Sequence, residues 1–160
     1  MDFFERTCRS LGLSDELYEL LNGENLENKQ HEAMLLMTVT EDGWPHNAMV
    51  SAGEVVALDK ENLRLALWPG TTTTKNCIRT RKATLVAVYK GRVHYTRLAV
   101  SPLGILEGTK HPLERFSAKI EFYKEDQAKY ADITSGIQIS LKDPSAVLSR
   151  WKETIQETLR

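Results

Sequence analysis

Short apolar runs separated by turn-forming residues recur along most of the chain. Runs of about 4–8 residues that are apolar throughout, or at alternate positions, are typical of β-strands. The Asp42-Gly43 pair between the first two runs is a strong signal for a tight hairpin. The pattern therefore predicts strands at 33–40, 46–51, 54–58, 63–68, 83–89, 93–100, 115–123 and 136–141.

Helical spacing of apolar residues is found in fewer places, and it is clearest at the C-terminus. Asp143 is the expected N-cap of a helix that runs to about residue 158, with Pro144 in its first turn. One face of this helix is apolar and carries Val147, Leu148, Trp151, Ile155 and Leu159. Trp151 is therefore expected to be a core or dimer contact.

Three shorter helices are predicted elsewhere. The first covers 14–22, where Ser14 is the expected N-cap and Asn22-Gly23 ends the helix. The polar stretch that follows, 24–32, either adds a second helical turn or forms a loop. The other two short helices are expected at 72–80 and 125–131.

Several predicted strands, such as 33–40 and 83–89, are apolar on both faces. Short antiparallel strands of this kind bury both faces most economically in a closed or nearly closed barrel. Helices then cover the open edges of the barrel. The expected fold is therefore mainly β with flanking helices, and residues 1–160 are expected to form one domain.

Composition agrees with a single globular domain: the chain has 160 residues, of which 41% are apolar and 27% are charged. The sequence contains no signal-peptide pattern and no apolar run of about 18 residues, so we expect a cytoplasmic protein with no membrane association. The two cysteines, Cys8 and Cys77, indicate neither a disulfide framework nor a metal site. The four histidines are scattered and have no metal-ligand spacing, so no metal is expected.

Positive charge is concentrated in the middle of the chain. Between Glu61 and Glu107 there is no Asp or Glu, although eight Lys and Arg residues lie there. The net charge of the whole chain is only −1, which argues against general nucleic-acid binding. A local site for an anionic ligand is the alternative that this distribution favours.

Four threonines, 71–74, follow the breaker pair Pro69-Gly70 inside this basic segment, and Lys75 and Asn76 come next. Threonine is a good N-cap, and the start of a helix has free N–H groups and the positive end of the helix dipole. A phosphate group is the natural ligand of such a site. The competing interpretation is a plain threonine-rich loop beside strands whose cations face water. The segment is not a Walker loop, because Lys75 occupies the position of the second glycine.

The order of these elements resembles the pyridoxamine 5'-phosphate oxidase-like FMN-binding split barrels over roughly residues 31–107. The resemblance is carried by the hairpin Leu36-Met-Thr-Val-Thr-Glu-Asp-Gly-Trp-Pro-His46 and, about 30 residues later, by Thr-Lys-Asn76 at a helix start. It implies an antiparallel split β-barrel that forms a homodimer and holds FMN at the subunit interface. FAD, the deazaflavin F420 or haem are the alternative cofactors in such proteins.

The resemblance also implies which residues contact the cofactor. Thr72, Thr73, Thr74, Lys75 and Asn76 would contact the phosphate and the ribityl chain. The edge of the isoalloxazine ring would run along Met49, Val50 and Ser51, and Leu67 and Trp68 would line its other side.

Two departures separate this chain from the vitamin-forming oxidase of that family. Asn47-Ala48 stands near the place where the oxidase has an arginine, so the phosphate contact is weaker or shifts to another cation such as Arg97 or Arg81. The C-terminal helix also lacks the Arg-x-His element that receives the oxidase's substrate. The sequence therefore predicts that the chain is not a true pyridoxamine phosphate oxidase.

Three functions remain open from the sequence. The first is an FMN-dependent oxidoreductase with no obligate side-chain catalyst, because the flavin carries the chemistry. The second is a flavin-binding or sensing module without turnover, and the third is a small barrel that binds a polyanion. His46 is either a proton donor beside the flavin or a surface histidine, and Cys77 is either an activated thiol or a small core residue.

Overall fold

Strand β8 (Glu114–Ala128) holds the sheet together, because it pairs with three other strands. The computed structural model describes residues 4–10 and 12–160. Within them, β7 (Arg92–Ile105) lies along one side of β8. On the other side, β5 (Asn62–Leu67) pairs with the first half of β8 and β1 (Phe4–Ser10) with the second half.

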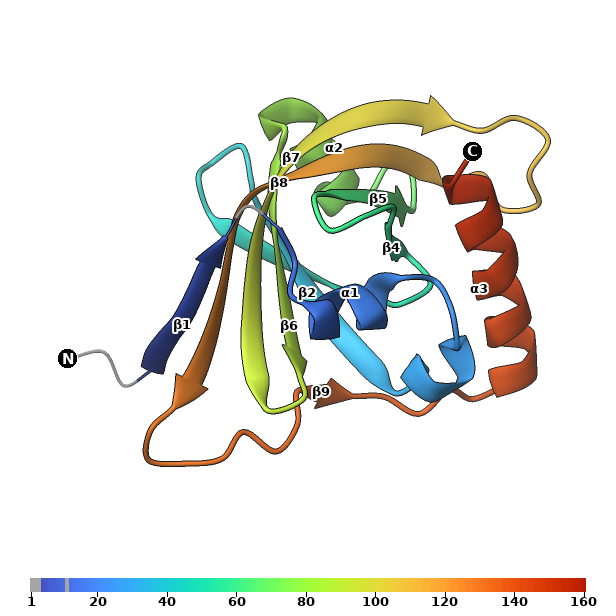
Figure 1. The fold of residues 1–160 in the computed structure, drawn as a ribbon. Helices are drawn as coiled ribbons and strands as arrows, with labels where there is room; N and C mark the ends of the chain where they lie inside the picture. Colours follow the sequence, from blue (N-terminus) through green and yellow to red (C-terminus); the bar gives the residue numbers. More distant parts are fainter. Residues whose placement is uncertain (1–3, 11) are drawn as a thin grey trace.

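The remaining strands extend this sheet from both β5 and β7. Beyond β5 lies β4 (Val55–Ala57); beyond β7 lie β6 (Lys82–Tyr89), β2 (Glu32–Val39) and β3 (Pro45–Ser51) in that order. The short strand β9 (Ile137–Gln138) pairs with the start of β2. Over the described residues these form one nine-stranded antiparallel sheet, which curls into the open barrel seen in Figure 1. The mainly β, split-barrel architecture expected from the sequence is confirmed.

In the described part of the chain, three α-helices and one 3-10 helix lie around the sheet (Figure 1). Helix α1 (Asp15–Leu21) is capped by the Ser14 side chain, which accepts a hydrogen bond from the amide of Leu17. Helix α2 (Thr72–Thr80) has the bounds predicted from the sequence. The C-terminal helix α3 (Pro144–Thr158) is capped by Asp143, also as predicted. None of the described helices is long and apolar enough to cross a membrane.

Two sequence predictions are wrong or incomplete. Residues 125–131 were expected to form a helix, but β8 continues to Ala128 because β1 and β7 pair with its backbone on both sides. Strand pairing of this kind overrides local propensity. Strand β1 was not predicted at all, and the expected strand 136–141 is reduced to β9. Of the two alternatives for 24–32, the structure has a short 3-10 helix, Leu26–Lys29, rather than a plain loop.

The buried apolar side chains of the described residues form two clusters. The larger one fills the barrel and includes Leu36, Leu65, Leu85 and Phe116, all fully buried. The smaller one lies under α3, where Trp151 and Ile155 pack against Leu26, Ala52 and Val56. Trp151 is therefore a core residue, one of the two roles predicted for it. Through this cluster α3 is fixed against the segment that joins β3 to β4.

Candidate functional site

The threonine-rich segment 71–74 forms the start of α2. The hydroxyls of two of its residues, Thr71 and Thr74, make hydrogen bonds that stabilise this helix start. Thr71 is the N-cap, and its hydroxyl oxygen accepts a hydrogen bond from the amide of Thr74 at 3.2 Å. The hydroxyl of Thr74 donates to the carbonyl oxygen of Trp68 at 2.7 Å, and this side chain is buried. Thr74 therefore shapes the loop from inside, whereas Thr72 is exposed at the tip.

Asn76 fixes the helix to the sheet. Its side-chain amide donates to the hydroxyl of Thr38 on β2 at 3.0 Å, and its side-chain oxygen accepts from Arg79 at 3.0 Å. Because Asn76 is buried and bonded on both sides, it positions the first turn of α2 against the hairpin formed by β2 and β3.

A cleft of about 260 Å³ lies between β3, the end of β5 and the first turn of α2. We call it the β3–α2 cleft; it is lined by His46, Ala48, Met49, Val50, Glu54, Leu67, Trp68, Thr71, Thr72 and Thr73. It brings together six of the ten residues that the sequence singled out: Met49, Val50, Leu67, Trp68, Thr72 and Thr73. Met49 and Trp68 keep 58% and 55% of their surface exposed, so both leave apolar surface open to a ligand.

Lys75 lies in a neighbouring groove of about 570 Å³ that shares Thr72 with the cleft. This groove is also lined by Asn76 and Arg79, and by Glu41 and Asp42 of the β2–β3 turn. Its charge is therefore mixed rather than purely positive. The two remaining predicted residues, Ser51 and Thr74, are buried behind the cleft and line neither space.

The residues at the β3–α2 cleft fit a flavin. Such a cofactor needs a flat apolar slot for its ring and an anion site for its phosphate. The exposed side chains of Met49 and Trp68 provide apolar surface at the cleft. The first turn of α2 supplies helix N–H groups and threonine hydroxyls at the same place.

Glu54 is the cleft residue that the sequence analysis missed. It follows the turn after β3, where its carboxylate oxygen Oε1 accepts a hydrogen bond from the Ser51 hydroxyl at 3.1 Å. Burial raises the pKa of this carboxyl group, and the bond from Ser51 and the charge of Arg150 act in the opposite direction. The burial of Glu54 could not be predicted from its neighbours in the chain, because a Glu that precedes an apolar strand is ordinarily a surface residue. His46, which sequence analysis left open as a proton donor, lies in the same cleft.

Arg81 and Arg97, which the sequence offered as replacement phosphate contacts, lie elsewhere. Both line a separate groove of about 850 Å³ over β6 and β7, together with Lys82 and Glu121. Arg81 is the C-cap of α2, so it stands at the opposite end of that helix from Thr72. These two arginines therefore do not share the β3–α2 cleft within this chain.

Cys77 is a core residue rather than an activated thiol. It is fully buried on α2, and burial raises the pKa of its thiol to about 11. A thiol that stays protonated in an apolar site is a weak nucleophile. The side chain of Cys8 lies outside the described part of the chain.

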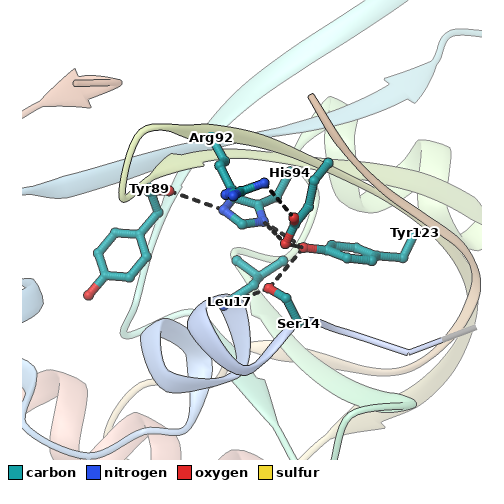
Figure 2. Close-up of polar contacts among 7 residues, drawn as sticks. Ser14, Leu17, Tyr89, Arg92, His94 and Tyr123 are labelled. Atoms are coloured by element: carbon teal, nitrogen blue, oxygen red, sulfur yellow. Dashed lines mark hydrogen bonds and ion pairs between the residues drawn. The ribbon is translucent and has the colours of Figure 1, made fainter. Parts of the chain in front are cut away.

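A second polar cluster lies inside the barrel beneath α1, and it is structural (Figure 2). The hydroxyl oxygen of Tyr123 is 2.6 Å from Nδ1 of His94, 2.8 Å from Oε1 of Glu125 and 2.9 Å from the Ser14 hydroxyl. The other ring nitrogen of His94 is 3.2 Å from the carbonyl oxygen of Tyr89, and Arg92 pairs with Glu125 at 3.3 Å. His94 is fully buried and Tyr123 nearly so, which leaves no room for a ligand. Burial lowers the pKa of His94 and raises that of Tyr123.

Metal binding has no support in the described residues, which contain no group of three or more His, Cys, Asp or Glu side chains able to hold an ion.

Solved structures share the fold of this chain. A candidate pyridoxamine 5'-phosphate oxidase from Lactobacillus delbrueckii aligns over 71% of this chain and 94% of its own, with a TM-score of 0.57 and 19% identity. HupZ of Group A Streptococcus aligns over 80% of this chain and 99% of its own, with a TM-score of 0.53 and 12% identity. An F420 reductase aligns over 69% and 97%, with a TM-score of 0.50 and 13% identity. The fold is the FMN-binding split barrel.

The sequence itself places the chain in a narrower group. It is 51% identical over 148 residues to YclD of Bacillus subtilis (strain 168), an uncharacterized protein, and the match covers 92% of this chain and 96% of YclD. The chain therefore belongs to the family of YclD. No family model matches the sequence.

Proposed function

We propose that this protein binds FMN in the β3–α2 cleft and uses it as an oxidoreductase. The observation that carries this proposal is the meeting of Met49 and Trp68, both exposed and apolar, with the first turn of α2 in one cleft. A flat ring with a phosphorylated tail complements these two features at once. When bound, the flavin supplies the hydride or electron transfer.

The residues of the chain have separate tasks in this proposal. Thr72, Thr73 and the N–H groups of the first turn hold the phosphate, and Lys75 adds a positive charge from the adjoining groove. Val50 and Leu67 form the buried part of the apolar wall, and Met49 and Trp68 form its exposed part. Thr74, Asn76 and Ser51 hold this arrangement in place from behind.

The test of FMN binding is a fluorescence titration of the purified protein. We expect Lys75→Ala and Thr73→Ala to weaken FMN binding by about 1–3 kcal/mol each, because the first removes a positive charge near the phosphate and the second removes a hydroxyl donor to it. Lys142→Ala is the matched control, since Lys142 is an exposed lysine outside the two spaces. Unchanged affinity in both site variants refutes the phosphate assignment.

A second copy of the chain completes the proposed site. Large apolar side chains are exposed on the β2–β3 hairpin, directly after β5 and at the end of β7. They are Val39, Trp44, Met49, Trp68, Leu103 and Ile105. Large exposed apolar side chains that gather in one patch are typical of an interface. We expect light scattering after size exclusion to give the mass of a dimer, and Leu103→Glu with Ile105→Glu to shift it toward the monomer. A monomeric wild-type protein at about 50 μM, well above the Kd of a stable dimer, contradicts this part of the proposal.

A flavin-binding module without turnover is the second candidate, since a cofactor-holding protein needs the same cleft. Reduction of the bound flavin by NADH or NADPH under anaerobic conditions separates the two functions. Bleaching of the visible flavin bands within seconds supports the oxidoreductase, and bands that persist for hours support the module. A colourless preparation that does not bind added FMN excludes both the oxidoreductase and the flavin-binding module, and it favours the polyanion-binding alternative.

A further inference from the structure

We propose that Glu54 selects ligands with a protonated amine for the β3–α2 cleft, so that the substrate of this protein is an organic amine rather than an acid. This proposal depends on the proposed function only where it calls the ligand a substrate. The selectivity for a protonated amine is a property of the cleft, whether or not a flavin binds there.

The backbone holds Glu54 firmly at the cleft. Its amide donates to the carbonyl oxygen of Ser51 at 3.1 Å, and its carbonyl oxygen accepts from the amide of Ala66 on β5 at 2.9 Å. The amide of Gly53 also bonds to the Ser51 hydroxyl at 3.3 Å, which closes the turn between β3 and β4. These bonds fix the backbone of Glu54, and the bond from the Ser51 hydroxyl to Oε1 orients its carboxylate.

The carboxylate of Glu54 has unused capacity for hydrogen bonds. An ionised carboxylate accepts about four hydrogen bonds, and the Ser51 hydroxyl supplies one of them. Among the described ion pairs with N–O distances up to 4.0 Å, none involves Glu54; the nearest influence of a cation is the longer-range charge of Arg150. Burying an ionised carboxylate without a close cation is unfavourable in free energy. For this reason burial raises the pKa of Glu54. A cationic ligand removes that cost.

The charge of Glu54 sets which ligands the cleft accepts beside it. The first turn of α2 attracts negative charge through its N–H groups and dipole. Glu54 lines the same cleft, where its carboxylate repels negative charge and attracts a cation. A second anion beside Glu54 is therefore disfavoured, whereas a protonated amine complements the carboxylate.

A purely structural role for Glu54 makes a different prediction. If the carboxylate only supported the turn, the Glu54→Gln variant would behave like the wild type, because the amide oxygen of Gln still accepts from Ser51. Glu54→Gln removes the charge and keeps the shape. Glu107→Gln is the control for an exposed glutamate outside the cleft.

The experiment uses benzylamine and benzoate as probes, and the fluorescence of Trp68 as the readout that does not require flavin. At about pH 8 benzylamine is protonated and benzoate is ionised. We expect benzylamine to change the emission of the wild-type protein, and this change to disappear in Trp68→Phe. In Glu54→Gln we expect its Kd to rise about tenfold, while benzoate binds more tightly than it does to the wild type. Glu107→Gln should behave as the wild type.

The outcomes separate this assignment from the flavin proposal. Equal benzylamine affinity in the wild type and Glu54→Gln, or preferred binding of benzoate by the wild type, overturns the role of Glu54 even if FMN binds as proposed. If the protein does not bind FMN but shows a Glu54-dependent response to benzylamine, the result supports the amine site and contradicts the proposal that the cleft binds FMN. Circular dichroism of Glu54→Gln shows that the variant is folded, so that loss of binding is not loss of structure.

Discussion

Replacing Gly53 by alanine is expected to destabilise the protein by about 3 kcal/mol, the upper part of the range for overpacking a core. A Cβ atom at this position would lie 2.2 Å from Cγ of Trp151 and 2.4 Å from Cδ1. The indole ring cannot retreat, because it is buried among Leu26, Ala52 and Val56. The chain therefore has to move α3 away from the β3–β4 turn or distort the turn itself.

Thermal and urea unfolding measure this effect. For a protein of this size about 3 kcal/mol corresponds to a fall in Tm of roughly 6–12 °C. Gly53→Ala combined with Trp151→Leu should be less destabilised than the sum of the two single variants, because the smaller side chain leaves room for the new methyl group. Ser149→Ala, on the exposed side of α3, is the control. A Gly53→Ala protein within about 0.5 kcal/mol of the wild type would show that the two elements are not in tight contact.

The Tyr123→Phe variant is expected to lose about 2–4 kcal/mol of unfolding free energy, although the change removes a single oxygen atom. That oxygen is the common partner of His94, Glu125 and Ser14 (Figure 2). Its removal leaves a buried ring nitrogen and a buried carboxylate oxygen with one partner fewer each. The aromatic ring remains, so the loss of packing is small and the effect measures the polar contacts.

Tyr95→Phe is the matched control for this variant. Tyr95 lies in the same sheet, opposite Lys124 of β8, and its ring stacks with the Lys124 ammonium group without a role for the hydroxyl in that contact. We expect urea unfolding of Tyr95→Phe to match the wild type within about 0.5 kcal/mol. If Tyr123→Phe and Tyr95→Phe unfold at the same urea concentration, the cluster beneath α1 contributes no net stability.

Local signals explain which parts of the fold were predictable. The N-caps Ser14 and Asp143 and the hairpin at Asp42-Gly43 depend on residues close together in the chain, and all three are present. Strand β1 and the second half of β8 stabilise one another by pairing, although more than one hundred residues separate them in the sequence. Neither segment has a strong strand pattern in its own sequence, so local sequence signals do not predict the pairing.

The candidate site was predictable to a similar extent. The sequence indicated the threonine-rich helix start and the apolar residues near it, because residue types and spacing were sufficient. It did not distinguish the exposed Thr72 from Thr74, whose hydroxyl is bonded to Trp68 inside the loop. Nor did it reveal Glu54, since the position of that carboxylate depends on a turn that Trp151 of α3 supports from the other end of the chain.

The pairing of β8 with β1, β5 and β7 has a consequence for synthesis on the ribosome. Until residues 114–128 have left the exit tunnel, the nascent chain carries β5 and β7 with unpaired edges and β1 with no neighbour. Exposed edges of this kind favour association with other chains. Folding of the barrel is therefore a late event, and these strand edges stay exposed for most of the time that the chain takes to be synthesised.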